Sequence, residues 1–288
     1  MIGWRSSSSD AEFPNVEVRI LSNNRRITPV SLNMGLRDSR GTVIIRVDGH
    51  CEIEPGYVRR CCEVLQATGY ENVGGSCVTE GETAMARAIA AAQSSQFGVG
   101  NVAFRVGRAE PGAVDTVPFG AWPRRVFDEV GAFDEDLVRN QDDEHNFRII
   151  QSGGTVWFDP AIRSRYFSRS SLRKLARQYF QYGSYKVRVM QKRGGVASPR
   201  HLVPAAFVAS VAASILLARV TRRSSWAAVV LGPYAVANAV ATARVSRADA
   251  VDPLTTSAAF AVLHTCYGAG TLHGIWRWRA HFRAAHSR

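Results

Sequence analysis

Residues 41–50 read Gly41-Thr-Val-Ile-Ile-Arg-Val-Asp48-Gly49-His50, an apolar run that ends at a carboxylate, a glycine and an imidazole. The β-branched residues of this run predict a buried strand, and Gly49 predicts the turn that ends it. In open α/β sheets, ligands bind just beyond the carboxyl ends of the strands. Because carboxylates suit Mg²⁺ or Mn²⁺ and imidazole suits Mn²⁺, Asp48 and His50 are candidate metal ligands. The alternative interpretation is that Asp48 caps the strand and His50 is a surface loop residue.

The chain of 288 residues carries a formal net charge of +12, and this charge is unevenly distributed. Residues 160–248 contain sixteen lysines and arginines and no aspartate or glutamate. Such a surplus predicts an anionic partner, either a nucleic acid or a membrane surface. The sequence contains no recognisable nucleic-acid-binding module, and the basic residues adjoin long apolar segments. We therefore expect a membrane partner and no nucleic acid.

The five cysteines show neither a Cys-x-x-Cys pair nor the spacing of a zinc site. An odd number of cysteines without a disulfide pattern is typical of reduced thiols in a cytoplasmic domain. The first ten residues, MIGWRSSSSD, contain no apolar core, so no signal peptide is expected.

The first 160 residues alternate between strand patterns and helix patterns. Strands are predicted at residues 16–21, 43–47, 72–78 and 155–158, the last one closed by Pro160, and helices at residues 29–37, 55–66, 83–97, 124–130 and 142–151. Glycine and proline punctuate residues 98–120, which we expect to be mainly loop. This alternation is typical of an α/β fold with a doubly wound sheet.

A second polar cluster lies at residues 139–148, Arg-Asn-Gln-Asp-Asp-Glu-His-Asn-Phe-Arg. Three acids at the start of a helix can simply stabilise the positive end of the helix dipole, by roughly 0.3–1 kcal/mol each. Crowded carboxylates also raise the pKa of at least one member, which suits a general base. Asp142 lies in the first turn, where its side chain can point into a cleft, and it is the candidate base.

Basic and aromatic side chains alternate through residues 161–200. Either an amphipathic helix at a bilayer surface or a solvated helix packed on the preceding domain fits this pattern. Three uncharged segments follow at residues 202–218, 226–243 and 253–276, close in length to the ~20 residues that cross a bilayer. We expect two or three transmembrane helices within residues 201–288, and a soluble helical hairpin is the alternative. Basic residues flank every segment, so the positive-inside rule leaves the number of crossings open.

Five stretches in a fixed order resemble the family 2 glycosyltransferases, and most closely the succinoglycan-type (ExoA-like) exopolysaccharide enzymes. They are Asn33-x-Gly-Leu36, Gly41 to His50, Asp115-Thr-Val-Pro-Phe-Gly120, Val130-Gly-x-Phe-Asp-Glu-x-Leu-Val138 and Asn140-Gln-Asp-Asp-Glu144. The run from Tyr166 to Tyr179 and the apolar carboxyl end are similar too, so the resemblance covers nearly the whole chain. It implies a GT-A (nucleotide-diphospho-sugar transferase) fold in residues 1–160. It also implies inverting, metal-dependent transfer from a nucleotide-activated sugar.

The resemblance implies roles for individual residues. Asp48 matches the first acid of the family's D-x-D signature, and His50 stands where the second acid often lies, so both are implied ligands of Mn²⁺ or Mg²⁺. Asp142 matches the aspartate of the family's Glu-Asp pair and is the implied catalytic base, although Gln141 replaces the usual glutamate. The further candidates for donor or acceptor binding are Asn33, Arg46, Gly49, Gly120, Asp143, Glu144, Arg169 and Gln178.

The implied partners are a nucleotide-sugar donor, in the first place a UDP-sugar, and a lipid-linked saccharide acceptor. The implied location is the inner (plasma) membrane, with the catalytic domain in the cytoplasm and a role in exopolysaccharide or cell-envelope glycan synthesis. The family's processive synthases carry a Gln-x-x-Arg-Trp motif, whereas this chain reads Gln178-Tyr-Phe-Gln-Tyr182. We therefore expect transfer of a single sugar.

Relatives begin with a β-α-β unit that holds much of the nucleoside site, and this chain joins the pattern at about residues 6–10. We expect a GT-A domain that is incomplete at its amino terminus and exposes an apolar sheet edge. The alternative function is a catalytically inactive transferase that serves as a membrane-bound partner protein.

Overall fold

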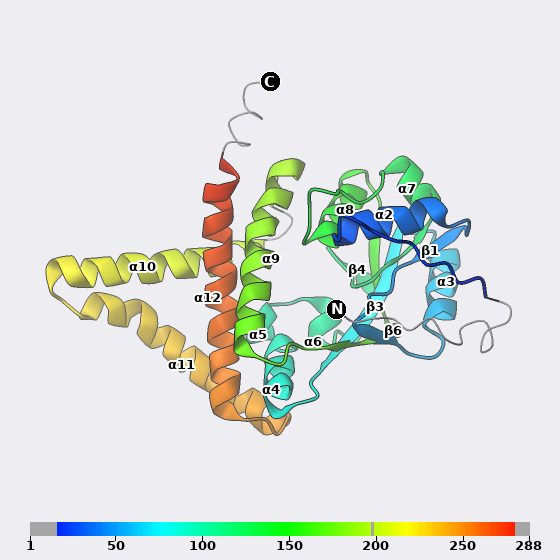
Figure 1. Ribbon diagram of the computed structural model, residues 1–288. Helices are drawn as coiled ribbons and strands as arrows, with labels where there is room; N and C mark the ends of the chain where they lie inside the picture. The colour runs from blue at the N-terminus through cyan, green and yellow to red at the C-terminus, as the bar shows by residue number, and fades with distance from the viewer. Residues whose placement is uncertain (1–15, 197–198, 280–288) are drawn as a thin grey trace.

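The computed structural model describes residues 16–196 and 199–279 and shows a mixed α/β domain joined to a long helical region (Figure 1). The strands are β1 (Val43–Ile45), β2 (Cys51–Ile53), β3 (Asn72–Glu80), β4 (Gly112–Ala113), β5 (Ala121–Pro123) and β6 (Val156–Phe167). The helices of the domain are α2 (Thr28–Asp38), α3 (Tyr57–Thr68), α4 (Ala84–Gln93), α5 (Gln96–Val99), α6 (Ala103–Val106), α7 (Arg125–Glu129) and α8 (Gln141–Gln151). The helical region contains α9 (Leu172–Arg193), a 3₁₀ turn (Pro199–His201), α10 (Val203–Thr221), α11 (Ser225–Ala248) and α12 (Pro253–Arg277).

One six-stranded sheet forms the centre of the domain, in the order β1-β5-β3-β6-β2, with β4 paired to β6. The two long strands β3 and β6 run parallel, and the other pairs are antiparallel. The carboxyl ends of β3 and β6 lie beside the segment between β1 and β2, because Cys51 pairs with Tyr166 and Tyr166 with Thr79. The segment Arg46–His50 therefore lies at the edge of the sheet where a ligand is expected.

The prediction that a strand closes at Pro160 is wrong, because β6 continues to Phe167. The ladder between β3 and β6 shifts register between Gly75 and Ser76, so that Asp159 and Arg163 pair with consecutive residues. The bulge removes Pro160, which has no N–H to donate, from the ladder. A Cβ at Gly75 would collide with backbone oxygens of the bulge, so only glycine fits there.

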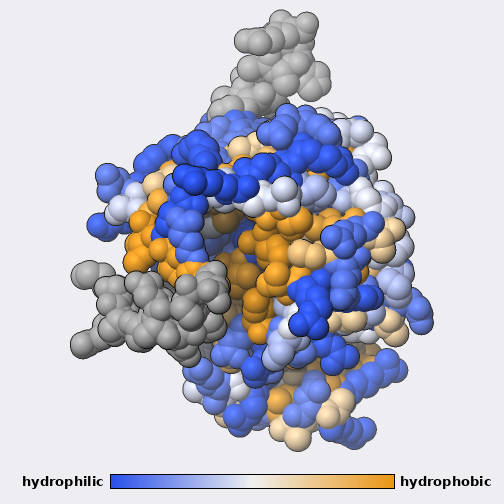
Figure 2. All heavy atoms as spheres, turned by 90° about the vertical axis from the view of Figure 1, so that its right-hand side faces the viewer, coloured by the Kyte–Doolittle hydropathy of each residue, from blue (hydrophilic) through white to orange (hydrophobic). Residues whose placement is uncertain are grey.

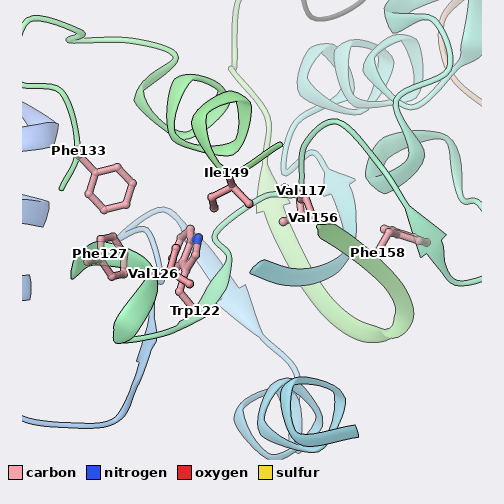
Figure 3. Close-up of a cluster of buried hydrophobic side chains, with 8 residues drawn as sticks. All are labelled: Val117, Trp122, Val126, Phe127, Phe133, Ile149, Val156 and Phe158. Atoms are coloured by element: carbon pink, nitrogen blue, oxygen red, sulfur yellow. The ribbon is translucent and has the colours of Figure 1, made fainter. Parts of the chain in front are cut away.

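Two apolar clusters pack on opposite faces of the sheet. Figure 3 shows the larger cluster, in which Trp122 of β5 lies beside Phe127 of α7, and Ile149 of α8 lies between this group and β6. On the other face, Cys61 and the apolar residues of α3 contact Ile162. Burial of these side chains fixes α8 against the sheet, and it therefore fixes the position of the first turn of α8.

Residues 16–21 were expected to form a strand, and that prediction is wrong. The segment is irregular, and Val16, Val18 and Ile20 are more than half exposed. Figure 2 shows apolar side chains around a hollow on the face that lies to the right in Figure 1, where β1 ends the sheet. Val47, which follows β1, and Val58 of α3 are also about half exposed.

The carboxyl-terminal half is helical at all three segments for which membrane-spanning helices were predicted. Among the described residues, α10 and α11 are long and apolar enough to cross a membrane, with mean hydropathy of 1.9 and 1.4. Figure 1 shows this hairpin extending away from the rest of the molecule. Helix α12 instead packs along α9, whose inward face buries Leu175, Tyr179 and Val187. The basic segment predicted at 161–200 thus comprises the end of β6 and a helix packed on the protein.

Small residues allow α9 and α12 to approach closely. A Cβ added at Gly270 would collide with the backbone oxygen of Phe180, and Gly183 has the same relation to Tyr267. Replacing Gly270 by alanine should therefore lower the free energy of unfolding by about 1–3 kcal/mol. The measurement is the melting temperature of the detergent-solubilised protein, which should fall. Gly232 of α11 has nothing near the position of a Cβ, so Gly232→Ala should be neutral or stabilise by up to ~1 kcal/mol. Equal effects of the two substitutions would contradict this packing.

Candidate active site

The turn that follows β1 presents Asp48 and His50. The strand ends at Ile45, and the turn is closed by the backbone N–H of Cys51, which donates to the Asp48 carbonyl oxygen at 3.2 Å. Its thiol donates to the same oxygen at 2.8 Å. The side chain of Asp48 is partly buried and that of His50 is exposed, so the turn offers both groups at the sheet edge.

Arg46 fixes the carboxylate of Asp48. Its Nε lies 2.8 Å from Oδ1 of Asp48 and its Nη2 lies 3.0 Å from Oδ2, a bidentate pair. The backbone N–H of Arg46 donates to the carbonyl oxygen of Gly120 at 3.1 Å. Gly120 has a φ of 59°, and a Cβ there would collide with Trp122. Gly120 thus holds the backbone of Arg46 and has a structural role.

The same guanidinium reaches the candidate base. Nη1 of Arg46 lies 3.8 Å from Oδ2 of Asp142, and it has no hydrogen-bond partner among the described residues. Asp142 occupies the first turn of α8, as predicted. Asn140 precedes that helix at a φ of 61° and donates from Nδ2 to the carbonyl oxygen of Tyr182, which fixes the start of α8 on α9. The two acids identified in the sequence therefore lie on either side of Arg46.

The protein environment changes the protonation of both candidate groups. Removal of water raises the pKa of Asp142, and the neighbouring Asp143 and Asp48 raise it further, while Arg46 opposes this shift. Desolvation lowers the pKa of His50 against the opposing charge of Asp48, and Arg169 lowers it further. His50 is therefore a neutral imidazole near pH 7, the form that binds metals.

A group of polar and aromatic side chains supports His50. The rings of His50 and Tyr166 meet edge to face with centroids 5.2 Å apart. Nε2 of Gln178 donates to the hydroxyl groups of Tyr166 at 3.1 Å and Tyr182 at 2.8 Å, and Arg169 donates to Oε1 of Gln178 at 3.3 Å. Arg169 and Gln178 were both predicted for substrate binding. They are connected to His50 by Tyr166, which accepts a hydrogen bond from Gln178 and contacts the imidazole ring.

Known proteins are similar to this chain in sequence and in fold. The model of the family described as "Glycosyl transferase family 2" matches residues 7–94. The succinoglycan biosynthesis protein ExoA of Rhizobium meliloti (strain 1021) is 30% identical over 292 residues, which cover 98% of this chain and 83% of ExoA. The chain belongs to glycosyltransferase family 2.

One further relative and one solved structure are also similar to this glycosyltransferase. The dolichyl N-acetyl-alpha-D-glucosaminyl phosphate 3-beta-D-2,3-diacetamido-2,3-dideoxy-beta-D-glucuronosyltransferase of Methanococcus voltae is 25% identical over 181 residues, 61% of this chain and 56% of that protein. The mannosyltransferase PcManGT from Pyrobaculum calidifontis, solved in complex with GDP-Man and Mn²⁺, matches with a TM-score of 0.50 at 17% identity. That match covers 88% of this chain and 68% of PcManGT, and it shows the GT-A-like fold.

Two residues predicted for substrate binding in this glycosyltransferase, Asn33 and Glu144, make buried contacts that stabilise the fold. Asn33 is buried, and its amide exchanges hydrogen bonds with the backbone of Phe133 at 2.8 and 3.0 Å. Glu144 is fully buried and pairs with Arg148 at 2.9 Å and with Arg193. These contacts occupy the polar atoms of both residues.

Two other predicted residues lie nearer to the site. Asp143 forms an ion pair of 2.7 Å with Lys186 of α9, whose side chain is 7% exposed. Gly49 is exposed in the turn, with nothing near the position of a Cβ, so no backbone constraint requires glycine there. The structure also places near the site two residues that the sequence did not single out for function, Lys186 and Arg105.

The turn offers only part of a metal coordination sphere. No group of three histidine, cysteine or acidic side chains suited to a metal ion occurs among residues 16–196 and 199–279. A carboxylate and a neutral imidazole fit Mn²⁺ or Mg²⁺ when waters and substrate phosphates supply the other ligands. Each oxygen of Asp48 that accepts from Arg46 retains a further lone pair for a cation. The residues present therefore fit an ion that arrives with a diphosphate.

Substitution of Glu144 can distinguish a role in stability from a role in catalysis. Glu144→Gln removes the buried partner of two arginines, so it should destabilise the protein by about 3–5 kcal/mol. Glu129, which is 57% exposed and pairs with Arg125 one turn away, is the matched control, and Glu129→Gln should cost less than about 0.5 kcal/mol. Chemical denaturation followed by circular dichroism measures both. A Glu144→Gln protein of parental stability that lacks transferase activity would assign Glu144 to catalysis instead.

Proposed function

We propose that this glycosyltransferase catalyses the inverting, metal-dependent transfer of one sugar from a nucleotide-sugar to a lipid-linked saccharide. The reaction would belong to exopolysaccharide or cell-envelope glycan synthesis at the inner (plasma) membrane, with the GT-A domain in the cytoplasm. The observation that carries the proposal is the position of Asp48 and Asp142 on either side of Arg46. One carboxylate is available for the donor's diphosphate and its cation, and the other for the acceptor hydroxyl.

The acceptor hydroxyl is too weak an acid to attack unaided. Asp142 accepts its proton while the oxygen forms a bond to the anomeric carbon of the donor sugar, and the bond from that carbon to the diphosphate breaks. A single in-line displacement of this kind inverts the configuration at the anomeric carbon. Desolvation raises the pKa of Asp142, which strengthens the carboxylate as a base, and the positive charge of Arg46 opposes this rise.

The leaving nucleoside diphosphate gains negative charge as it departs. Asp48 and His50 would hold a divalent cation, which supplies electrostatic stabilisation of that charge when bound. Arg46 contributes by orienting the carboxylate of Asp48. A UDP-sugar is the first donor to test. A GDP-sugar is the second, because the fold is shared with a mannosyltransferase solved with GDP-Man.

The acceptor assignment rests on the hairpin of α10 and α11. Leu216, Val220, Val229 and Val236 of this hairpin are each more than 60% exposed. A monomeric protein in water rarely exposes so much contiguous apolar surface, whereas a bilayer would cover it. A relative from Methanococcus voltae is named for a dolichyl-phosphate-linked acceptor, and another is named for succinoglycan biosynthesis. The first name supports an acceptor linked to a lipid, and the second supports a role in polysaccharide synthesis.

The role of Asp142 predicts a large loss of transfer. Asp142→Asn should reduce kcat about 10²–10⁴-fold, measured as label transferred from a panel of UDP- and GDP-sugars to polyprenyl-linked saccharides. Asp136→Asn is the control, because Asp136 is 69% exposed. Activity of the parent should rise with pH through a midpoint above the ordinary aspartate pKa, since the ionised form is the base and burial raises its pKa. Full activity of the Asp142→Asn protein would refute the mechanism, and inactivity of the parent would favour a non-catalytic partner protein.

The metal assignment predicts a change in Mn²⁺ affinity. Asp48→Asn should raise the Kd for Mn²⁺ in the presence of UDP at least tenfold, measured by electron paramagnetic resonance of the unbound ion. Asp128, exposed on α7, provides the control substitution Asp128→Asn, which should leave this affinity within about twofold. Because the loss of Asp48 leaves Arg46 buried without its partner, folding is checked by thermal melting. Unchanged Mn²⁺ affinity in a folded Asp48→Asn protein would exclude Asp48 as a ligand.

A further inference from the structure

Arg105 is a partly buried cation without a carboxylate partner among the described residues. Its Nη1 donates a hydrogen bond to Oγ1 of Thr79 at 3.2 Å. No ion pair joins Arg105 to a carboxylate within residues 16–196 and 199–279. A partly desolvated cation without a counter-charge destabilises the folded protein. Such a residue is retained more readily where a bound anion supplies the missing charge.

The groups around Arg105 fix the position of its guanidinium without neutralising its positive charge. The guanidinium lies over the rings of Phe104 and Tyr166, with centroid distances of 5.4 and 5.5 Å. The groups that interact with it electrostatically are Cys77 and the tyrosines 166, 179 and 182, none of which is a carboxylate. Arg105 is therefore preorganised by aromatic faces and a hydroxyl group, with its positive charge uncompensated.

A cavity of about 720 Å³ opens beside Arg105. Its lining includes the charged residues Arg105, Arg108, Arg163 and Glu54, so positive charge prevails. The carbon ring of Phe104 and the small side chains of Ser76 and Cys77 complete the wall. Cavities that combine an apolar wall with a few convergent arginines suit a phosphoester attached to an apolar group.

The cavity lies between the candidate active site and the membrane hairpin. The ring of Tyr166 contacts both His50, at 5.2 Å between centroids, and the guanidinium of Arg105, at 5.5 Å. Ser94, which follows α4, also lines the cavity, and the adjoining helix α5 packs Phe97 against Tyr234 of α11 at 6.3 Å. A ligand that extends from α11 towards His50 would therefore pass Arg105.

We propose that Arg105, assisted by Arg108 and Arg163, binds the phosphate groups that join the acceptor saccharide to its lipid. This inference rests on the proposed transfer to a lipid-linked acceptor and names the part of the protein that recognises it. The donor's diphosphate has a separate place at Asp48 and His50, and Tyr166 contacts both His50 and Arg105. The saccharide of the acceptor then lies along Tyr166, and its terminal hydroxyl reaches Asp142.

Binding of an isoprenyl diphosphate tests this site without requiring catalysis. The full chain, in nanodiscs of neutral phosphatidylcholine, is titrated with geranylgeranyl diphosphate and with geranylgeraniol, which lacks the phosphates, by isothermal calorimetry. We expect the diphosphate to bind at least tenfold more tightly than the alcohol. Arg105→Gln should weaken diphosphate binding at least tenfold, and Arg105→Lys should weaken it less. Arg59→Gln, at an exposed arginine of α3, should change it less than twofold.

Saturating UDP with Mn²⁺ tests whether the isoprenyl diphosphate binds at Arg105 or in the donor site. If the isoprenyl diphosphate occupies the Arg105 site, its affinity stays within about twofold when UDP is bound. Displacement by UDP would place the ligand in the donor site and overturn the inference, as would an Arg105→Gln protein that binds normally. If Arg105→Gln fails to fold, Arg163→Gln at the exposed rim decides, and an affinity loss of threefold or more supports the site while no loss overturns it.

The transfer assay described for Asp142 is run on the same preparations. Absence of transfer with intact, Arg105-dependent binding would refute the proposed reaction and leave the anion site in place. Transfer that proceeds with an unchanged acceptor KM in Arg105→Gln would refute the anion site alone. The expected result is an acceptor KM raised at least tenfold with a donor KM within twofold of the parent.

Discussion

The arrangement of the site depends on the charge of one buried arginine. Arg46 is anchored through its backbone to Gly120, whose neighbour Ala121 begins the strand that joins β1 to β3. Its side chain then holds Asp48 in a fixed orientation and stands beside Asp142. Without this cation two carboxylates would repel each other across a partly desolvated space. The sheet therefore fixes Arg46, and Arg46 fixes the relation between the two acids.

The three consecutive acids at the start of α8 lie in three different electrostatic environments. Asp143 is paired with Lys186, and Glu144 is enclosed with Arg148 and Arg193. Within the part of the chain that the structure describes, the cation nearest to Asp142 is Arg46, at 3.8 Å. Like charges next to one another in the sequence thus acquire different environments, and one of them retains the basicity that proton transfer requires. Helix α9 supplies two of the three cations that pair with Asp143 and Glu144, so it takes part in shaping the site.

Much of the fold could be predicted from the sequence, and the failures have physical causes. The helix that starts at Gln141 and the buried strand at Asn72 follow from local patterns. The alternation of residues 16–21 predicted a strand, yet a strand forms only where a neighbour offers hydrogen bonds. Pro160 was expected to end a strand, but a bulge against Gly75 lets the strand continue. These outcomes depend on partners distant in the sequence.

The sequence singled out the acids of the candidate site and its cations Arg46 and Arg169, but it did not single out Lys186 or Arg105. Asp48 and Asp142 stand out because carboxylates interrupt apolar or helical patterns. Arg105 lies in a stretch that reads as loop, where an arginine is ordinarily solvated, and only the folded structure shows that aromatic rings enclose it. Asn33 and Glu144 illustrate the opposite case, because their hydrogen bonds and ion pairs within the fold cannot be read from a motif.

The packing of α12 on α9 makes the connection between the hairpin and α8 rigid. Helix α12 meets α9 through glycines at backbone distance, and α9 is fixed to the start of α8 by Asn140 and Lys186. With α10 and α11 seated in a bilayer, Asp142 would stand at a set height above the lipid surface. The protein would then select its acceptor by length, because only a lipid-linked saccharide of matching length could present its terminal hydroxyl at that height.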